Sequence, residues 1–262
     1  GVSLNGARTG AGSVTLTGTV PAGVIYDWYS NATATILLLA GSNSYTTPSI
    51  SQTTTYYPVA RNITTGCTSA TASAVATINP VLSGGVINSV TTSICGSGIP
   101  GALNSTTAAT GGTGTYIYQW QSSATSSVSG FTDIAGANAA TYTPSSSISV
   151  TTYYRRAVST ATDAVVYSNV LAVTVVSLPN VKISPGSATI SNGNSQTLTA
   201  SGADTYVWTP STNLSATTIG TISASPTVTT AYTVTGTNAA TSCVNTATIT
   251  VTVVPALSSG TI

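Results

Sequence analysis

Three tryptophans stand at nearly equal spacing along this chain of 262 residues. Trp28, Trp120 and Trp208 lie roughly 90 residues apart, and each is followed by a stretch rich in threonine that contains tyrosine. Self-similarity at a fixed period identifies the unit that folds, because each repeat has to build its own core. The spacing therefore predicts three units in tandem.

Proline-containing segments separate the predicted units. We expect the first unit over residues 1–79, the second over 81–177, the third over 180–254, and the start of a further repeat over 255–262. Units of about 80–95 residues fall inside the usual size range of domains. Because proline fixes φ and removes a hydrogen-bond donor, these short connections favour a semi-rigid rod.

Alternation of hydroxyl and apolar side chains indicates β-strands in every unit. Residues 13–20 and 196–200 alternate in this way, and so do the closing stretches 72–78, 170–175 and 246–253. Turn-forming Gly, Pro and Asn fall between these stretches at short intervals. Short strands in units of this size are typical of antiparallel β-sandwiches. The predicted fold class is all-β, with three tandem sandwiches in a rod-like array.

Charged side chains are nearly absent from the sequence. They make up 3% of the residues, against about 25% in an ordinary globular domain, and the net charge is +1. Such a charge gives no long-range field toward nucleic acid or anionic lipid. No apolar run reaches the length of about 18 residues that spans a bilayer, so no membrane insertion is expected in this segment. Hydroxyl and amide groups have to keep the chain in solution, with surface glycans as a further candidate partner.

The chemistry-bearing side chains are too few for catalysis. Without His or Glu, neither a Ser-His-Asp arrangement nor a ready general base near neutral pH can be assembled. Zinc or calcium would need clustered ligands, whereas the carboxylates are scattered among the units. The four carboxylates are Asp27, Asp133, Asp163 and Asp204. We therefore expect no catalytic residue, no metal site and no cofactor.

The tryptophans are predicted to form the structural core, since each stands within an alternating strand. A carbohydrate-stacking platform is the alternative. In the later threonine-rich strands, adjacent residues point to opposite faces, so one tyrosine of each pair is buried. We assign Tyr56, Tyr153 and Tyr232 to the core. We expect Tyr29, Tyr57 and Tyr154 to be exposed, where packing between units is favoured over ligand contact.

The only adjacent pair of charged residues is Arg155-Arg156. We expect both side chains on a solvated strand surface.

The sequence also resembles a known class of repeats. The residues that carry the resemblance are Asp27-Trp28-Tyr29, residues 45–50, 54–57 and Gly66-Cys67 in the first unit, residues 118–123, 142–144 and 152–156 in the second, and residues 184–186, 206–208 and 232–234 in the third. The first unit is similar to the Ig-like repeats of large secreted Bacteroidota surface proteins, and the third to their PKD-like variety. Such repeats occur in gliding-motility-type adhesins and other cargo of the type IX secretion system. The resemblance implies three tandem immunoglobulin-like domains, and its motifs are specific for the repeat class but weak for function.

The three cysteines occupy two kinds of position. Cys67 and Cys243 each follow a core tyrosine by 11 residues, whereas Cys95 aligns with Thr9 and Asn192. In the resembled family these two positions usually pair within one domain, but here each unit holds only one of them. A bridge from Cys67 to Cys95 fails on geometry if the units form a head-to-tail rod. The extended strand after Cys67 and the chain before Cys95 would then hold the two Cα atoms far beyond the separation of under about 7 Å that a disulfide needs. We predict no disulfide and three unpaired cysteines. Either these cysteines are buried and inert, or a partner cysteine is misassigned in the sequence.

Together these observations predict a non-catalytic structural or adhesin segment at the surface of a bacterial cell. It would form an extracellular stalk or surface filament, as part of a longer protein. Neighbouring repeats are the expected partners, and identical chains in a filament are a further candidate, because uncharged edge strands are templates for pairing. Two alternatives stay open: a carbohydrate- or protein-binding module, which an exposed aromatic cluster would favour, and accessory modules of a secreted hydrolase.

Overall fold

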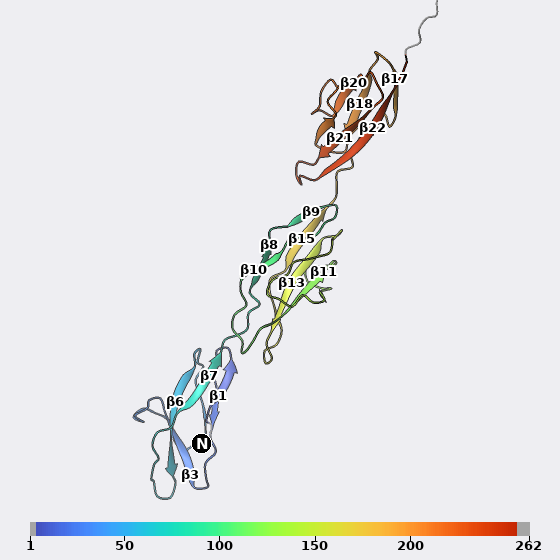
Figure 1. The fold of residues 1–262 in the computed structure, drawn as a ribbon. Coiled ribbons are helices and arrows are strands. Elements are labelled where there is room, and N and C mark those ends of the chain that lie inside the picture. The colour runs from blue at the N-terminus through green and yellow to red at the C-terminus, as the bar shows by residue number, and fades with distance from the viewer. Residues whose placement is uncertain (1–3, 256–262) are drawn as a thin grey trace, which may run out of the picture.

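The structure is a computed structural model that describes residues 4–255. Over these residues the chain forms 22 strands and no helix. The strands fall into three groups that follow one another along an elongated molecule (Figure 1). The predicted all-β fold is confirmed. Apart from Pro255, the expected start of a further repeat over 255–262 lies outside the described residues.

The first group of strands lies between Gly6 and Asn79. Its members are β1 (Gly6–Thr9), β2 (Thr15–Thr17), β3 (Val24–Tyr29), β4 (Leu37–Leu39), β5 (Ser44–Thr46), β6 (Thr54–Asn62) and β7 (Ala74–Asn79). One sheet has the order β1-β7-β6-β3-β4, and β2 pairs with β5 in a second, smaller sheet. The apolar side chains of both sheets meet in one core around Trp28, Leu16 and Tyr56.

The second group lies between Val86 and Val176. Its members are β8 (Val86–Ser89), β9 (Ser93–Cys95), β10 (Leu103–Thr107), β11 (Ile117–Ser123), β12 (Thr132–Asp133), β13 (Thr152–Ser159), β14 (Val166–Tyr167) and β15 (Leu171–Val176). The larger sheet has the order β12-β11-β13-β15-β9, with β14 against β13, and β10 pairs with β8. Two core clusters fill this unit, one around Trp120 and one around Leu82 and Val158.

The third group lies between Lys182 and Val254. Its members are β16 (Lys182–Ser184), β17 (Ala188–Ser191), β18 (Gln196–Ser201), β19 (Thr205–Thr209), β20 (Thr221–Ala224), β21 (Thr230–Thr237) and β22 (Val244–Val254). A sheet of order β16-β18-β20 packs against one of order β17-β22-β21-β19. Their shared core contains Trp208, Leu198 and Tyr232.

All three units share one strand pairing. An early strand runs parallel to the last strand of its own unit, as β1 with β7, β9 with β15 and β17 with β22. The other pairings within the sheets are antiparallel. Each unit therefore ends on a strand whose final residue lies beside the end of an early strand. This places two chain segments together at the exit of every unit.

The tryptophans are the centre of each core. The side chains of Trp28 and Trp120 are fully buried, and Trp208 is 1% exposed. Each indole nitrogen donates to a main-chain carbonyl at 2.8–3.0 Å, and the acceptors are Ser42, Ala139 and Ile219 respectively. Every buried indole thus has a polar partner as well as an apolar surround. The three tryptophans are buried, with no face left for stacking on a ligand.

Strand register decides which tyrosine joins each tryptophan. Trp120 pairs with Arg156 across β11 and β13, so the residue two positions earlier, Tyr154, lies on the same face of the sheet. Tyr154 is 4% exposed, whereas Tyr153 is only half-buried. The assignment of Tyr153 to the core and of Tyr154 to the surface was therefore wrong by one residue. Tyr56 and Tyr232 are buried, as predicted.

Candidate functional site at the junctions between units

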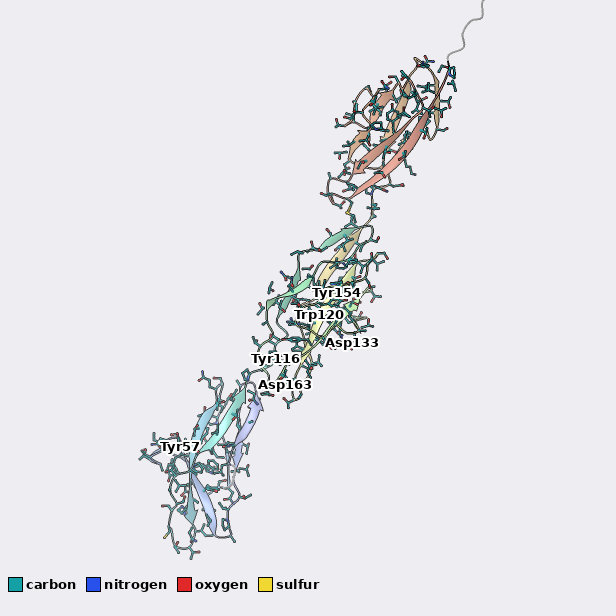
Figure 2. The ribbon with its side chains drawn as sticks, viewed as in Figure 1. Tyr57, Tyr116, Trp120, Asp133, Tyr154 and Asp163 are labelled. Carbon is teal, nitrogen blue, oxygen red and sulfur yellow. A yellow bond between two sulfur atoms is a disulfide. The ribbon has the colours of Figure 1, made fainter. Side chains whose placement is uncertain are left out.

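The carboxylates are each used locally, and they do not gather. Within residues 4–255, no group of three or more His, Cys, Asp or Glu side chains could hold a metal ion. Asp133 accepts from Gln121 at 2.8 Å, and Asp204 accepts from the Ala239 amide at 2.8 Å. Figure 2 shows Asp133 and Asp163 at separate places on the second unit. The described carboxylates therefore accept hydrogen bonds that hold strands and loops in place.

Asp27 forms the ion pair of the first unit. Its carboxylate is 2.6 Å from Arg61 Nε and accepts from the Gly41 amide at 2.8 Å. The hydrogen bond from Arg61 holds the pKa of Asp27 below its usual value, against the opposing effect of burial. The pair ties β3 to β6 and to the loop that contains Gly41.

Arg156 contradicts the expectation of a solvated surface. Its side chain is completely buried beside Trp120. The guanidinium donates to the carbonyl oxygens of Gly84 at 2.9 Å and Ala140 at 2.5 Å, and also to the Ser105 hydroxyl. No carboxylate pairs with it, and burial lowers its pKa. The cation therefore links β13 to three segments of the second unit through main-chain and hydroxyl acceptors.

Arg155 points to the opposite face of the sheet and is half-buried. Its guanidinium lies 4.1 Å from the ring centroid of Phe131 and 3.8 Å from that of Tyr167, and it donates to Gln121 at 2.7 Å. Arg155 thus occupies one face of each ring. These aromatic side chains stabilise an arginine and do not form a free stacking platform.

An open hollow of about 510 Å³ lies on the second unit. It is lined by hydroxyl and apolar side chains: Ser122, Ala124, Gly130, Thr132, Ile134, Tyr142, Pro144, Ser146, Ser147, Ile148, Ser149, Val150, Thr152 and Tyr154. No charged side chain lines it, and Tyr154 is buried beneath it, next to Trp120 (Figure 2). The hollow has no convergent charged groups that would select a ligand.

The first unit also has an apolar edge. Strand β4 is at the end of its sheet, and Leu37, Leu38 and Leu39 are 53%, 39% and 39% exposed. The expected lateral pairing of identical chains would use an edge of this kind. That pairing stays a prediction.

The junction between the first two units is built from the linker itself. The Gly112 amide donates to the Pro80 carbonyl at 2.8 Å, and Leu82 is buried in the core of the second unit. Nearby, Asp163 accepts from the Thr113 amide at 2.6 Å and from the Thr160 hydroxyl at 2.7 Å. These bonds lower the pKa of Asp163. Tyr116 and Asp163 lie at the end of the second unit that faces the first (Figure 2).

The junction between the second and third units is covalent. Cys95, at the end of β9, forms a disulfide with Cys243, which immediately precedes β22; their Cα atoms are 5.5 Å apart. Asn245 donates from its side-chain amide to the Pro179 carbonyl at 3.0 Å, so the linker is held as well. The prediction of no disulfide, with Cys95 and Cys243 unpaired, was wrong.

Cys95 and Cys243 pair across the junction because the last strand of each unit runs from the entry end of the unit to its exit end. Cys95 lies beside Val176, at the exit of its unit, whereas Cys243 lies at the start of β22, at the entry of its own. Since β22 has 11 residues, these two positions are about 35 Å apart within one unit. The family resemblance implied that these two positions pair inside one unit. They are too far apart for that, and they meet only across a junction.

Cys67 has no disulfide partner among the described residues and is exposed. The expectation that it is buried was therefore wrong. One pattern visible in the sequence relates it to Cys243: an asparagine stands five residues before each cysteine, as Asn62 and Asn238.

Comparison with known families agrees with this architecture. Residues 2–80 match the family described as Ig-like domain CHU_C associated. The chain is a tandem of immunoglobulin-like domains. The resemblance to Ig-like tandem repeats is confirmed, and residues 83–177 also match a family described as a domain of unknown function, DUF8696. A search of curated proteins found no match.

Several solved immunoglobulin-domain tandems are similar to these domains. Sidekick-1 immunoglobulin domains 1–5 align over 97% of this chain and 59% of theirs, at 13% identity and a TM-score of 0.39. The three N-terminal domains of the bacteriophage RB49 Highly Immunogenic Outer Capsid protein align over 97% and 99%, at 12% identity and 0.39. Drosophila OTK extracellular domains 3–5 align over 97% of this chain and 97% of theirs, at 11% identity and a TM-score of 0.33.

Across residues 4–255, no helix has the length and apolar character needed to cross a bilayer.

Proposed function

We propose that these immunoglobulin-like domains form a stalk that carries an adhesive element away from the surface of a bacterial cell. Immunoglobulin-like domains are typical of adhesion and surface proteins, and the match of residues 2–80 supports that class. The stalk role, secretion by the type IX system and the cell-surface location are parts of the proposal. Its mechanism is geometric: the domains set reach, and the junctions set stiffness.

The disulfide between Cys95 and Cys243 is the observation that carries this proposal. A flexible linker lets adjacent domains reorient, whereas a second covalent connection across the same junction restricts that motion. The linker hydrogen bond from Asn245 to Pro179 acts in the same direction. Disulfides persist mainly in oxidising compartments, which supports an extracellular location.

The low charge also supports a spacer. A shaft that carries few charges has no field that steers ligands toward it. The tryptophans are buried, and the rings of Phe131 and Tyr167 contact Arg155. Neither set of aromatic side chains supports the alternative of a carbohydrate-binding module.

Small-angle scattering tests the stalk. We expect the maximum dimension of the oxidised chain to correspond to three domains end to end, with a narrow range of conformations. Cys243→Ser should widen the range of conformations, because it frees the second junction only. Cys67→Ser is the matched control and should leave that range unchanged. A compact particle, or a distribution as broad for the oxidised chain as for Cys243→Ser, would contradict the proposal. Antibody labelling of intact cells of the source organism tests the location.

A further inference from the structure

The turn that contains Cys67 repeats the turn that contains Cys243. In the first domain the Asn62 amide donates to the Cys67 carbonyl at 2.9 Å, and in the third the Asn238 amide donates to the Cys243 carbonyl at 2.9 Å. The residue before each cysteine has a left-handed φ: 70° at Gly66 and 57° at Ser242. Two turns with the same bonds present their cysteines in the same way.

The side-chain bonds of the two turns also correspond. Asn62 Oδ1 accepts from the amides of Thr64 and Thr65, both at 2.9 Å. Asn238 Oδ1 accepts from the amides of the residues at the same offsets, at 3.1 and 3.2 Å. The correspondence therefore covers the whole turn and not the cysteine alone.

Both turns lie at the entry end of their domains. Each joins the two strands before the exit, β6 to β7 in the first domain and β21 to β22 in the third. Strand β7 leads at its far end into the second domain (Figure 1), so the Cys67 turn lies at the opposite end of the first domain. Cys243 in the same position is bonded to the domain that precedes it.

The two junctions of the chain show that the cysteines occur together or not at all. At the second junction, Cys95 at the exit meets Cys243 at the entry. At the first junction, Thr9 takes the place of Cys95, because it pairs with the last residue of β7 as Cys95 pairs with the last residue of β15. The entry loop of the second domain there holds Asp163 and no cysteine. At the one junction that has an entry cysteine, an exit cysteine on the preceding domain is bonded to it.

We propose that Cys67 is the entry half of another disulfide between domains. Its partner is the exit cysteine of a further immunoglobulin-like domain, N-terminal to the first in the parent protein. That cysteine ends the strand that runs parallel to the last strand of its domain, and a glycine with left-handed φ follows it, as Gly96 follows Cys95.

The reaction needs an oxidant that the secretory environment supplies. The two thiols lose two protons and two electrons and form one S–S bond. An existing disulfide, of a small molecule or of an oxidoreductase, accepts both and is reduced to two thiols. The exposure of Cys67 leaves its thiol open to this exchange.

Peptide mapping of the parent protein tests the inference directly. The protein is isolated from its own cells without reductant, its free thiols are alkylated, and the peptides are analysed before and after reduction. We expect the Cys67 peptide to be linked to a Cys-Gly peptide from outside residues 1–262, while Cys95 stays linked to Cys243. An alkylated Cys67, a small thiol attached to it, or a link to any other cysteine would overturn the proposal.

A designed fusion gives a second measurement. A copy of residues 81–179, which contains its own Cys95 and linker, is placed before Gly1 of the whole chain. We expect Cys67 to bond to the added copy and the fusion to contain no free thiol, whereas Cys67→Ser should leave the added cysteine free. A Cys67 that still reacts with maleimide, while Cys95 and Cys243 are bonded in the same molecule, would overturn the proposal.

The inference rests on the stacked arrangement that the proposed stalk also uses, but the two fail in different ways. A free Cys67 would leave the scattering dimension of the present chain unchanged. A compact scattering particle would contradict the stalk, and the disulfide map would still show the partner of Cys67.

Discussion

Arg156 lies directly opposite Trp120 in the β11–β13 register, and both side chains are fully buried. The corresponding residues opposite Trp28 and Trp208 are Pro58 and Val234, so the second domain has a cation where the others have an apolar side chain. Arg156 also lies 5.0 Å from the ring centroid of Tyr118. Its hydrogen bonds to Gly84, Ser105 and Ala140 join segments that are far apart in the sequence.

Arg156→Met should therefore destabilise the second domain. The substitution fills most of the space but leaves the buried carbonyl of Gly84 without its donor, and an unsatisfied buried acceptor costs about 1–3 kcal/mol. It also removes the hydrogen bond to the carbonyl of Ala140, which is an exposed residue, and the contacts with the rings of Trp120 and Tyr118. We expect a loss of about 2–4 kcal/mol in the free energy of unfolding, measured by native-state hydrogen exchange over residues 84–176. Arg155→Met is the matched control, with a loss of about 1 kcal/mol at most. If hydrogen-exchange protection is equal in Arg156→Met and in the unmodified chain, these bonds make no net contribution to the free energy of unfolding.

Loss of the disulfide should uncouple the second and third domains. A cross-link over a sequence separation of 148 restricts the unfolded chain by about 5 kcal/mol on the chain-entropy account. We expect calorimetry of Cys95→Ser to show a lower unfolding temperature for these two domains and an unchanged first domain. Cys67→Ser should leave every transition in place. If reductant lowers the transitions of Cys95→Ser as much as those of the unmodified chain, the bond is not the cause.

Acid should destabilise the first domain through Asp27. Because Arg61 holds the pKa of Asp27 below its unfolded value, the unfolded chain binds more protons there as the pH falls. The stabilisation is therefore complete above the unfolded pKa of about 3.9 and is lost as the pH falls through the folded pKa. Asp27→Asn should flatten this part of the profile in pH-dependent hydrogen exchange of residues 4–79. Asp133→Asn, in the second domain, should leave that profile unchanged, and a steep profile in Asp27→Asn would assign the effect elsewhere.

Removing one indole donor should weaken one domain only. Trp208→Phe leaves the Ile219 carbonyl without its bond and opens a small cavity, which costs about 2–4 kcal/mol. Because each domain has its own core, hydrogen exchange should rise over residues 182–254 and not over residues 4–79. Trp28→Phe should give the converse pattern. Exchange that rises equally in all domains would mean that the array unfolds as one unit.

The repeated core could be predicted from the sequence, but which of two adjacent tyrosines faces that core could not. The equal spacing of the tryptophans and the alternation of the strands identified the sandwiches, because both patterns are local. Tyr153 was assigned in place of Tyr154 because the choice depends on the register against β11, which is a tertiary property. The buried state of Arg156 was missed for a related reason: its acceptors are main-chain carbonyls, which no side-chain pattern marks.

The cysteine pairing depended on a geometry that the sequence does not display. The equivalence of Cys67 and Cys243 could be found from spacing, and the matching asparagines would have strengthened it. That the two classes of cysteine stand at opposite ends of a domain follows from the parallel pairing of β9 with β15. A parallel partner far along the chain cannot be inferred from alternation alone.

The bond between Cys95 and Cys243 also determines which part of the chain carries tension. When the two ends are pulled, the covalent path runs through the first domain to Cys95, crosses to Cys243 and continues along β22. The intervening chain, which includes most of two domains, lies outside that path and cannot be drawn out until the bond is reduced. A protease that cuts any loop between the two cysteines would likewise leave the ends of the rod joined.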